Sequence, residues 1–357
     1  MIRKLAKKTK PLCYLPCGNL VCYSYGKLIV FSENTIISEH NLFSNFKERH
    51  FWHSKLLIRL LRLGVRQAIA MDDDHIILSV KNEIYEYCFS TKQLSKGFVM
   101  NDRIRPLIFS VIKDVEGFDD GVVFGGYLMN MEKDPVHIYK RVSIDNWEIV
   151  YSFKKGEINH IHNIISDPYR KCLWVLTGDF DEAAAIWKVS DNYKKVEKVI
   201  SNNQSYRACV AYALPEGLLY ATDTPFIDNY IYLIRDLNTM MAEKVLPIDG
   251  SCIYGCKWND LFVFSSTVEG GDENDTLLDD LLKHQLGKGI KNDYTHLYIG
   301  NLDKGFKEIT KEKKDSLPYL FQFAAYMFPS GENRGDALYF YPMATKKNDL
   351  CLMSYCE

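Results

Sequence analysis

Short apolar runs separated by turn residues dominate the chain, and helical spacing of apolar positions is nearly absent. The runs are rich in β-branched and aromatic residues and are bounded by Gly, Asn, Asp or Pro, which is typical of strands. The pattern therefore predicts an all-β protein. The clearest runs are KLIVFSE, HIILSV, EIYEYCF, GVVFGGYL, CLWVLTG, GLLYATD, YIYLIRD, DLFVFSS, HLYIGNL and ALYFYPM.

These runs repeat as a unit, with one apolar strand, a turn, a second apolar strand, and a further strand ending near Tyr or Trp. The period is about 40–50 residues, as expected for the blades of a β-propeller. We predict a propeller with six blades, with seven as the alternative; a pair of β-sandwiches is the competing architecture. Blade starts are predicted near Asn19, Val65, Pro106, His160, Tyr206, Ser251 and Phe321.

The two ends of the chain are predicted to complete one blade together. The C-terminal block supplies three strands, and PLCYLP at residues 11–16 would add the fourth, which removes open sheet edges. Residues 11–357 are therefore expected to form a single propeller domain, closed by pairing of N- and C-terminal strands. Residues 1–10 would be a basic, solvated lead-in.

Two stretches interrupt the repeat. Residues 47–67 have Leu and Arg at mixed spacing and predict either a short helix or an outer strand with a basic face. Residues 270–293 predict a helical insertion, in which four leucines between 277 and 282 form an apolar stripe and Gly287 ends the helix.

Composition narrows the functional classes. Aromatic residues make up 13% of the chain, and the net charge of −2 gives no general attraction to nucleic acid. No segment reaches the ~20 apolar residues of a membrane span, so no transmembrane segment is expected. The 10 cysteines are scattered without paired C-x-x-C spacing, which favours reduced, buried thiols and a cytoplasmic location.

A polar constellation is expected on the propeller axis. His160 and His162 project to one face of a strand because side chains alternate. The first strand of each blade lines the central channel, so Arg105 and Arg207, which also open blades, should converge with the histidines. Further candidates are Gln204, and Asp179 and Asp223 in the matching phrases TGD and ATD.

This set suits an acidic carbohydrate. Arginine binds carboxylates with paired hydrogen bonds. Glycoside hydrolysis uses paired carboxylates, while lyase chemistry on a uronate uses a His or Tyr base. Each residue also has a structural interpretation: the H-x-H as a hydrogen-bonded pair, the aspartates as turn caps, and Tyr127 and Asn229 as packing or turn residues. The carboxylate candidates are Asp179, Asp181, Glu182, Asp223 and Glu269.

Two hairpins resemble degenerate Asp-boxes, the S-x-D-x-G-x-x-W turn of bacterial neuraminidase (BNR) repeats. NLDKGF (301–306) keeps Asp303, Gly305 and an aromatic residue, and SIDNW (143–147) keeps Ser, Asp and Trp. The aspartate of such a turn is expected to cap backbone N–H groups, with the aromatic ring packed beneath.

A longer ordered series, over roughly residues 100–270, resembles sialidase-like BNR-type propellers of poorly defined function, many associated with surface-polysaccharide genes. Gly126 departs from that pattern, which has Glu there, and Asn202–Asn203 replace Gly–Ser. The matching pieces are RPL (105–107), GGY (125–127), Asn130, PVHIY (135–139), HIH (160–162), DPY (167–169), WVLTGD (174–179), NNQSYR (202–207), TDTP (222–225), NYIY (229–232) and TVE (267–269).

Together, the residues and the resemblance imply a carbohydrate-active propeller that acts on an acidic oligo- or polysaccharide as a glycosidase or polysaccharide lyase. The alternatives are a non-catalytic glycan-binding module and a protein-interaction propeller. The Glu157-x-x-His160-x-His162 run is similar to the metal-ligand run of oligogalacturonate lyases, which implies a divalent metal on His160, His162 and Gln204. The expected catalytic residues are His160, His162, Asp179, Asp223 and Tyr127, and the expected substrate-binding residues are Arg105, Gln204, Arg207, Asn229 and Glu269.

Overall fold

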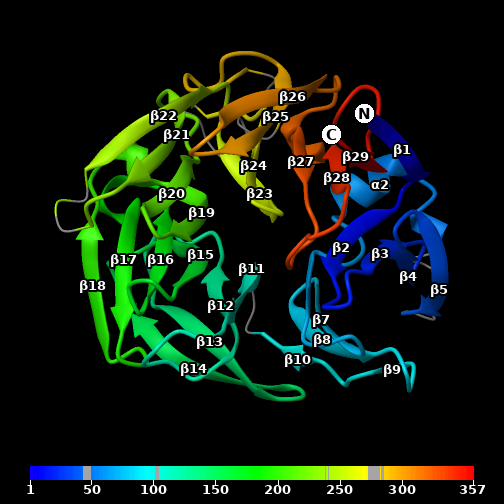
Figure 1. Cartoon of the computed structure of the whole chain (residues 1–357), viewed down its shortest axis with the longest axis horizontal. Helices are drawn as coiled ribbons and strands as arrows, with labels where there is room; N and C mark the ends of the chain where they lie inside the picture. Colours follow the sequence, from blue (N-terminus) through cyan, green and yellow to red (C-terminus); the bar gives the residue numbers. More distant parts are fainter. Residues whose placement is uncertain (43–49, 101–103, 238, 240, 272–281, 283–284) are drawn as a thin grey trace.

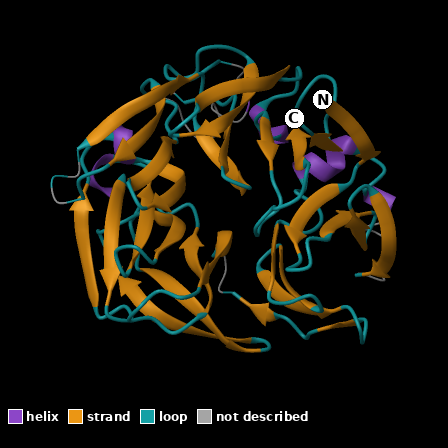
Figure 2. Ribbon diagram, viewed as in Figure 1, coloured by secondary structure: helices purple, strands orange, loops and turns teal. Residues whose placement is uncertain are grey.

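A computed structural model describes the chain except for residues 43–49, 101–103, 238, 240, 272–281 and 283–284. The described strands form seven antiparallel sheets that follow one another around a ring (Figure 1). Strands account for most of the ordered backbone, and the helices are short (Figure 2). The protein is therefore an all-β, seven-bladed β-propeller.

The first four sheets follow the chain order. The first contains β2 (Lys10–Tyr14), β3 (Leu20–Ser24), β4 (Lys27–Ser32) and β5 (Thr35–Asn41). The second contains β6 (Gln67–Ala70), β7 (His75–Val80), β8 (Glu83–Cys88) and β10 (Phe98–Val99), with β9 (Gln93–Leu94) also paired to β8. The third contains β11 (Arg105–Ile112), β12 (Gly121–Tyr127), β13 (Val136–Ser143) and β14 (Asn146–Phe153). The fourth contains β15 (His160–Asp167), β16 (Cys172–Gly178), β17 (Ala185–Ser190) and β18 (Lys195–Ile200).

The last three sheets include both ends of the chain. The fifth contains β19 (Ala208–Leu214), β20 (Gly217–Thr222), β21 (Asn229–Ile234) and β22 (Ala242–Ile248). The sixth contains β23 (Cys252–Trp258), β24 (Leu261–Ser266), β25 (Tyr294–Asn301) and β26 (Gly305–Lys313). The seventh contains β27 (Ala325–Met327), β28 (Leu338–Met343), β29 (Cys351–Tyr355) and β1 (Ile2–Lys7).

The hydrophobic core is divided into layers between neighbouring sheets. One apolar cluster lies between each successive pair, and another joins the seventh sheet to the first. The second strands β3, β16 and β20 are buried along their whole length because both of their faces meet a neighbouring sheet. This explains why those strands appear in the sequence as continuous apolar runs rather than alternating ones.

The sequence favours six blades, and that number is wrong. The predicted starts from Val65 onward fall within four residues of the observed first strands, whereas the start near Asn19 coincides with β3, the second strand of the first sheet. The first strand of that sheet is β2 (Lys10–Tyr14), which includes residues 11–14 of the segment 11–16 that the sequence assigns to the C-terminal block. Once β2 is counted as the first strand of its own blade, the number of blades is seven.

The N-terminal residues differ from the prediction. Residues 2–7, expected within a solvated lead-in, form β1, which is hydrogen bonded to β29. The exposed basic side chains of Arg3, Lys4 and Lys7 flank partly buried Leu5 and Ala6, which pack against the cluster between the seventh and first sheets. The charges that suggested a lead-in therefore belong to an outer strand.

The two interrupting stretches have different outcomes. Within 47–67 the structure has a helix, α2 (Lys55–Leu60), begun by Ser54, whose Oγ accepts a hydrogen bond from the Leu57 N–H. Half of the predicted helical insertion at 270–293, including three of its four leucines, lies outside the described residues, so that prediction stays open.

The predicted cap in the 301–306 hairpin is made by a different residue. Asn301 Oδ1 accepts the Lys304 N–H at 2.9 Å, which is the role expected of Asp303. Gly305 takes a positive φ of 75° and Phe306 packs on Phe264, so the hairpin keeps the glycine and aromatic parts of the motif.

Two expectations about the environment can be compared with the structure. No described helix is long and apolar enough to cross a membrane. All ten cysteines are free thiols, and five of them are fully inaccessible or nearly so: Cys13, Cys22, Cys172, Cys209 and Cys252. A cytoplasmic location remains a prediction.

Candidate functional site

A central cavity of about 440 Å³ opens where the first strands of the blades begin and the second strands end. Its wall includes Arg105 at the start of β11, His162 on β15, and Asp179 directly after β16. The predicted convergence of residues from separate blades is therefore observed. The cavity also contains Tyr127, Arg207, Asp223 and Glu269.

The two histidines have their ring orientations set by backbone carbonyls. His160 Nδ1 donates to Leu128 O at 2.9 Å, and His162 Nδ1 donates to Ala208 O at 3.0 Å. Each Nε2 is then left without its own proton in the neutral ring, and the two Nε2 atoms lie 2.9 Å apart. A shared proton or a bound cation is needed to satisfy this pair.

Asp179 supplies the counter-charge. Its Oδ1 lies 3.1 Å from His162 Nε2, 3.3 Å from His160 Nε2 and 3.1 Å from an Arg207 guanidinium nitrogen. Burial alone would raise the pKa of Asp179, but Arg207 and His160 outweigh it and hold that pKa well below its usual range. Asp179 is therefore a carboxylate rather than a proton donor.

Arg207 links Asp179 to a second carboxylate. Its Nε lies 3.7 Å from Asp223 Oδ2, which also accepts the Cys209 thiol at 3.1 Å. Burial would lower the pKa of Arg207, yet the two aspartates raise it above its ordinary value. The guanidinium is therefore a permanent cation at the cavity floor.

Glu269 differs from the two aspartates because no described cation forms an ion pair with it. Its Oε1 accepts the Thr267 hydroxyl at 3.2 Å. Burial, aided by the nearby charge of Asp223, raises the pKa of Glu269 to about 7. This is the cavity carboxyl that can carry a proton near neutral pH, as a general acid must.

Another part of the cavity wall is strongly basic. Arg62, Arg66 and Arg105 all line the cavity, and none forms a salt bridge with a described carboxylate. Burial and then the charges of Arg105 and Arg62 lower the pKa of Arg66 to about 10. Arg105 lies over the Tyr127 ring, 5.5 Å from its centroid. Lys10 extends this wall, and burial beside Arg66 lowers its pKa to about 7.

Three buried polar atoms in this cavity have no hydrogen-bond partner among the described residues. They are Arg66 Nε, Arg207 Nε and Asp223 Oδ1. Buried polar groups in native proteins are rarely left unpaired, so such atoms indicate a ligand or bound solvent.

Two predicted residues lie behind the cavity rather than in it. Gln204 donates from Nε2 to Asp179 O at 2.8 Å and accepts the Thr224 hydroxyl at 2.9 Å. Asn229 is buried and binds the backbone of Thr224 and Gly289. Gln204 therefore positions Asp179, and Asn229 holds a loop.

The residues that could bind a metal ion in the cavity differ from the set implied by the sequence, which was His160, His162 and Gln204. The ligand atoms of His160, His162 and Asp179 lie within 4.8 Å of one another, so these three could hold a divalent cation. Gln204 is not among these ligands, because its side-chain amide is hydrogen bonded to the Asp179 carbonyl and the Thr224 hydroxyl. Arg207 already places a positive charge beside Asp179. The metal remains a prediction.

The departure at Gly126 does not open a gap in the cavity. A side chain added there would face Val136, the His137 carbonyl and Ile104, none of which lines the cavity. Its neighbour Tyr127 faces the cavity instead. Among the remaining acids, Glu182 is exposed beside Lys198 and takes no part in the site.

Sequence reasoning missed part of the basic wall. Arg62 and Arg66 follow α2, and Tyr254 comes from β23. The only signal was the basic face noted for residues 47–67. Nothing local indicates that a segment between two blades turns its arginines inward.

Comparisons with known proteins support the fold. No family model matches the chain, and no curated protein matches it. The solved CNH domain of AfRom2 is similar at a TM-score of 0.55 and 7% identity, covering 100% of this chain and 99% of that one. The β-propeller domain of Myceliophteria thermophila Cps50 (Swd1) is similar at 0.53 and 8%, with the same coverage. At these identities the likeness concerns the fold alone.

Proposed function

We propose that the central cavity binds an acidic sugar unit of an oligo- or polysaccharide and acts on it as a glycosidase or lyase. The observation that carries this proposal is the wall of Arg62, Arg66 and Arg105, which have no carboxylate partner among the described residues. Three uncompensated guanidinium groups around a concave site attract an anion, and a carboxylate can take two parallel hydrogen bonds from each.

Other cavity residues supply groups for proton transfer. The Nε2 atoms of His160 and His162 lie 2.9 Å apart, neighbouring charges keep Asp179 ionised, and burial raises the pKa of Glu269 to about 7. Groups with separated pKa values are the usual signature of acid–base assignments. Glu269 is the proposed acid, and His162, which lines the cavity, is the proposed base.

The test is calorimetric titration with uronate and sialyl oligosaccharides and their neutral counterparts. Arg105→Ala should weaken binding of the acidic ligands at least about tenfold, or roughly 1.4 kcal/mol, while leaving neutral sugars unchanged. Arg235, which forms an exposed pair with Glu243, provides the matched control Arg235→Ala. Equal affinity for acidic and neutral sugars, or no binding of any of them, would refute the proposal.

Turnover separates the enzyme from a binding module. Product formation from the acidic oligosaccharide should be lost in His162→Gln and Glu269→Gln while binding persists. Saturable binding without products in the wild type would favour the glycan-binding alternative. A protein partner that competes with no glycan would favour the interaction alternative.

A further inference from the structure

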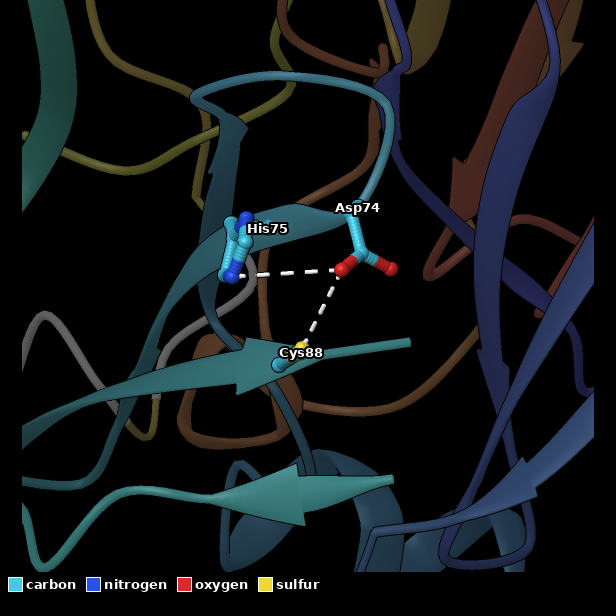
Figure 3. Close-up of side chains that lie close together, drawn as sticks. All are labelled: Asp74, His75 and Cys88. Atoms are coloured by element: carbon cyan, nitrogen blue, oxygen red, sulfur yellow. Dashed lines mark hydrogen bonds and ion pairs between the residues drawn. The ribbon is translucent and has the colours of Figure 1, made fainter. Parts of the chain in front are cut away.

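A second cluster of ligating side chains lies in the second sheet, away from the central cavity. Strand β6 starts at the cavity wall with Gln67 and runs away from it, and β7 returns from the far end beginning at His75. Cys88 ends β8 and is paired with His75 in the antiparallel ladder. These two side chains and that of Asp74 lie close together (Figure 3), and none of the three lines the central cavity.

Their ligand atoms are close enough to share one ion. Asp74 Oδ2 lies 3.2 Å from Cys88 Sγ and 4.0 Å from His75 Nε2, and all three atoms fall within 4.8 Å of one another. Zinc bonds of about 2.0–2.3 Å in a tetrahedral arrangement place ligand atoms roughly 3.3–3.8 Å apart. Only small side-chain adjustments separate the observed arrangement from that geometry.

A fourth residue orients the imidazole for metal binding. Asp72 accepts His75 Nδ1 at 3.0 and 3.1 Å through its two oxygens. Its Oδ1 is in turn held by the backbone N–H groups of Asp74 and His75, both at 2.7 Å. The proton of the neutral ring is thereby kept on Nδ1, and the Nε2 lone pair faces Asp74. A carboxylate behind a ligating histidine is the usual outer arrangement of zinc sites.

The donor set indicates the metal. A thiolate, an imidazole and a carboxylate suit zinc, whereas magnesium and calcium prefer oxygen donors alone. The side chains of His75 and Asp74 are 41% and 38% exposed, so a fourth position is open to water. The Ser90 hydroxyl, 2.6 Å from Asp74 Oδ2 and 3.3 Å from Cys88 Sγ, borders that position.

We propose that Cys88, His75 and Asp74 bind a zinc ion, with Asp72 as the positioning residue. On binding, the Cys88 thiol releases its proton to solvent, and the metal replaces the S–H hydrogen bond to Asp74. The site is independent of the function proposed for the cavity, since the two share no residue.

The test is titration of the reduced full-length protein with Co²⁺, followed by competition with Zn²⁺. We expect a thiolate-to-cobalt charge-transfer band that saturates at one ion per chain and disappears when zinc is added. Cys88→Ser and His75→Gln should abolish the band. Asp72→Asn should retain it with about 10–100-fold weaker affinity.

Two controls locate the ion. His162→Gln removes the residue shared by the two possible ligand groups in the central cavity, His160–His162–Asp179 and His162–Cys209–Asp223. Cys17→Ser removes an exposed thiol outside these groups. Both variants should keep the band unchanged. The proposal is overturned if the wild type shows no such band, or if the band survives Cys88→Ser or is lost in His162→Gln. Far-ultraviolet circular dichroism of Cys88→Ser verifies that loss of the band is not loss of the fold.

Discussion

At the scale of single residues, the surroundings of each cavity carboxyl group, rather than its residue type, decide whether it is ionised. Asp179 lies against Arg207 and two imidazoles and stays ionised. Glu269 lies beside a hydroxyl and an aspartate and holds its proton to about pH 7. The difference arises because opposite charges lower a carboxyl pKa, whereas burial and like charges raise it.

Glu269 gives a prediction on pH dependence. Because its folded pKa of about 7 lies above the ordinary 4.5, the carboxyl favours the fold below pH 4.5, and this contribution is lost as the pH rises through 7. Glu269→Gln should therefore gain stability relative to the wild type across that window, by up to about 3 kcal/mol. Urea unfolding at several pH values measures the difference. Exposed Glu182→Gln should show a flat difference, and a flat result for Glu269→Gln would contradict the assignment.

At the scale of elements, neighbouring blades meet so closely that glycine is required at one contact. A Cβ on Gly125 of β12 would lie 2.2 Å from Ile161 Cγ2 on β15. Ile161 lies between His160 and His162, so the packing between these strands also sets the position of the histidine pair. The adjacent Gly126 has no neighbour closer than 3.4 Å to such a Cβ.

The two glycines make a matched pair for mutagenesis. Gly125→Ala should destabilise the protein by about 1–3 kcal/mol through overpacking and should weaken ligand binding in the cavity by shifting β15. Gly126→Ala should change the free energy of unfolding by less than about 0.5 kcal/mol. Denaturant unfolding of both variants measures the contrast. Similar losses for both would show that the close contact with Ile161 does not limit stability.

At the scale of the whole molecule, one buried arginine joins segments from opposite ends of the chain. Arg59 of α2 is almost completely inaccessible and forms ion pairs with Asp315, which follows β26, and Asp349, which precedes β29. It also donates to the carbonyl of Phe321. The helix between the first two sheets is thereby attached to the connection from β26 to β27 and to the connection between β28 and β29 within the seventh sheet.

Removal of this arginine should leave Asp315 paired only with Lys314, and Asp349 only with the more distant Lys55. Arg59→Met should cost about 3–5 kcal/mol, as is usual when one member of a buried ion pair is lost. Lys27→Ala, which breaks an exposed pair with Glu39, should cost under about 1 kcal/mol. Thermal and urea unfolding provide the measurement, and equal losses in the two variants would contradict the role of Arg59.

The local pattern of the sequence determined the strands, most blade starts, and the placement of His160 and His162 on one face. These features follow from period-two alternation and from turn residues, which act within a few positions. The number of blades and the strand role of residues 2–7 were decided by pairing across the whole chain. Tertiary structure alone brought Arg62 and Arg66 to the cavity, because they come from the segment between the first two sheets. It also decided that Arg207 forms ion pairs with Asp179, which follows a strand of the fourth sheet, and with Asp223, which follows a strand of the fifth. The Asp74–His75–Cys88 cluster likewise depends on strand register, which pairs His75 with Cys88 across the β7–β8 ladder.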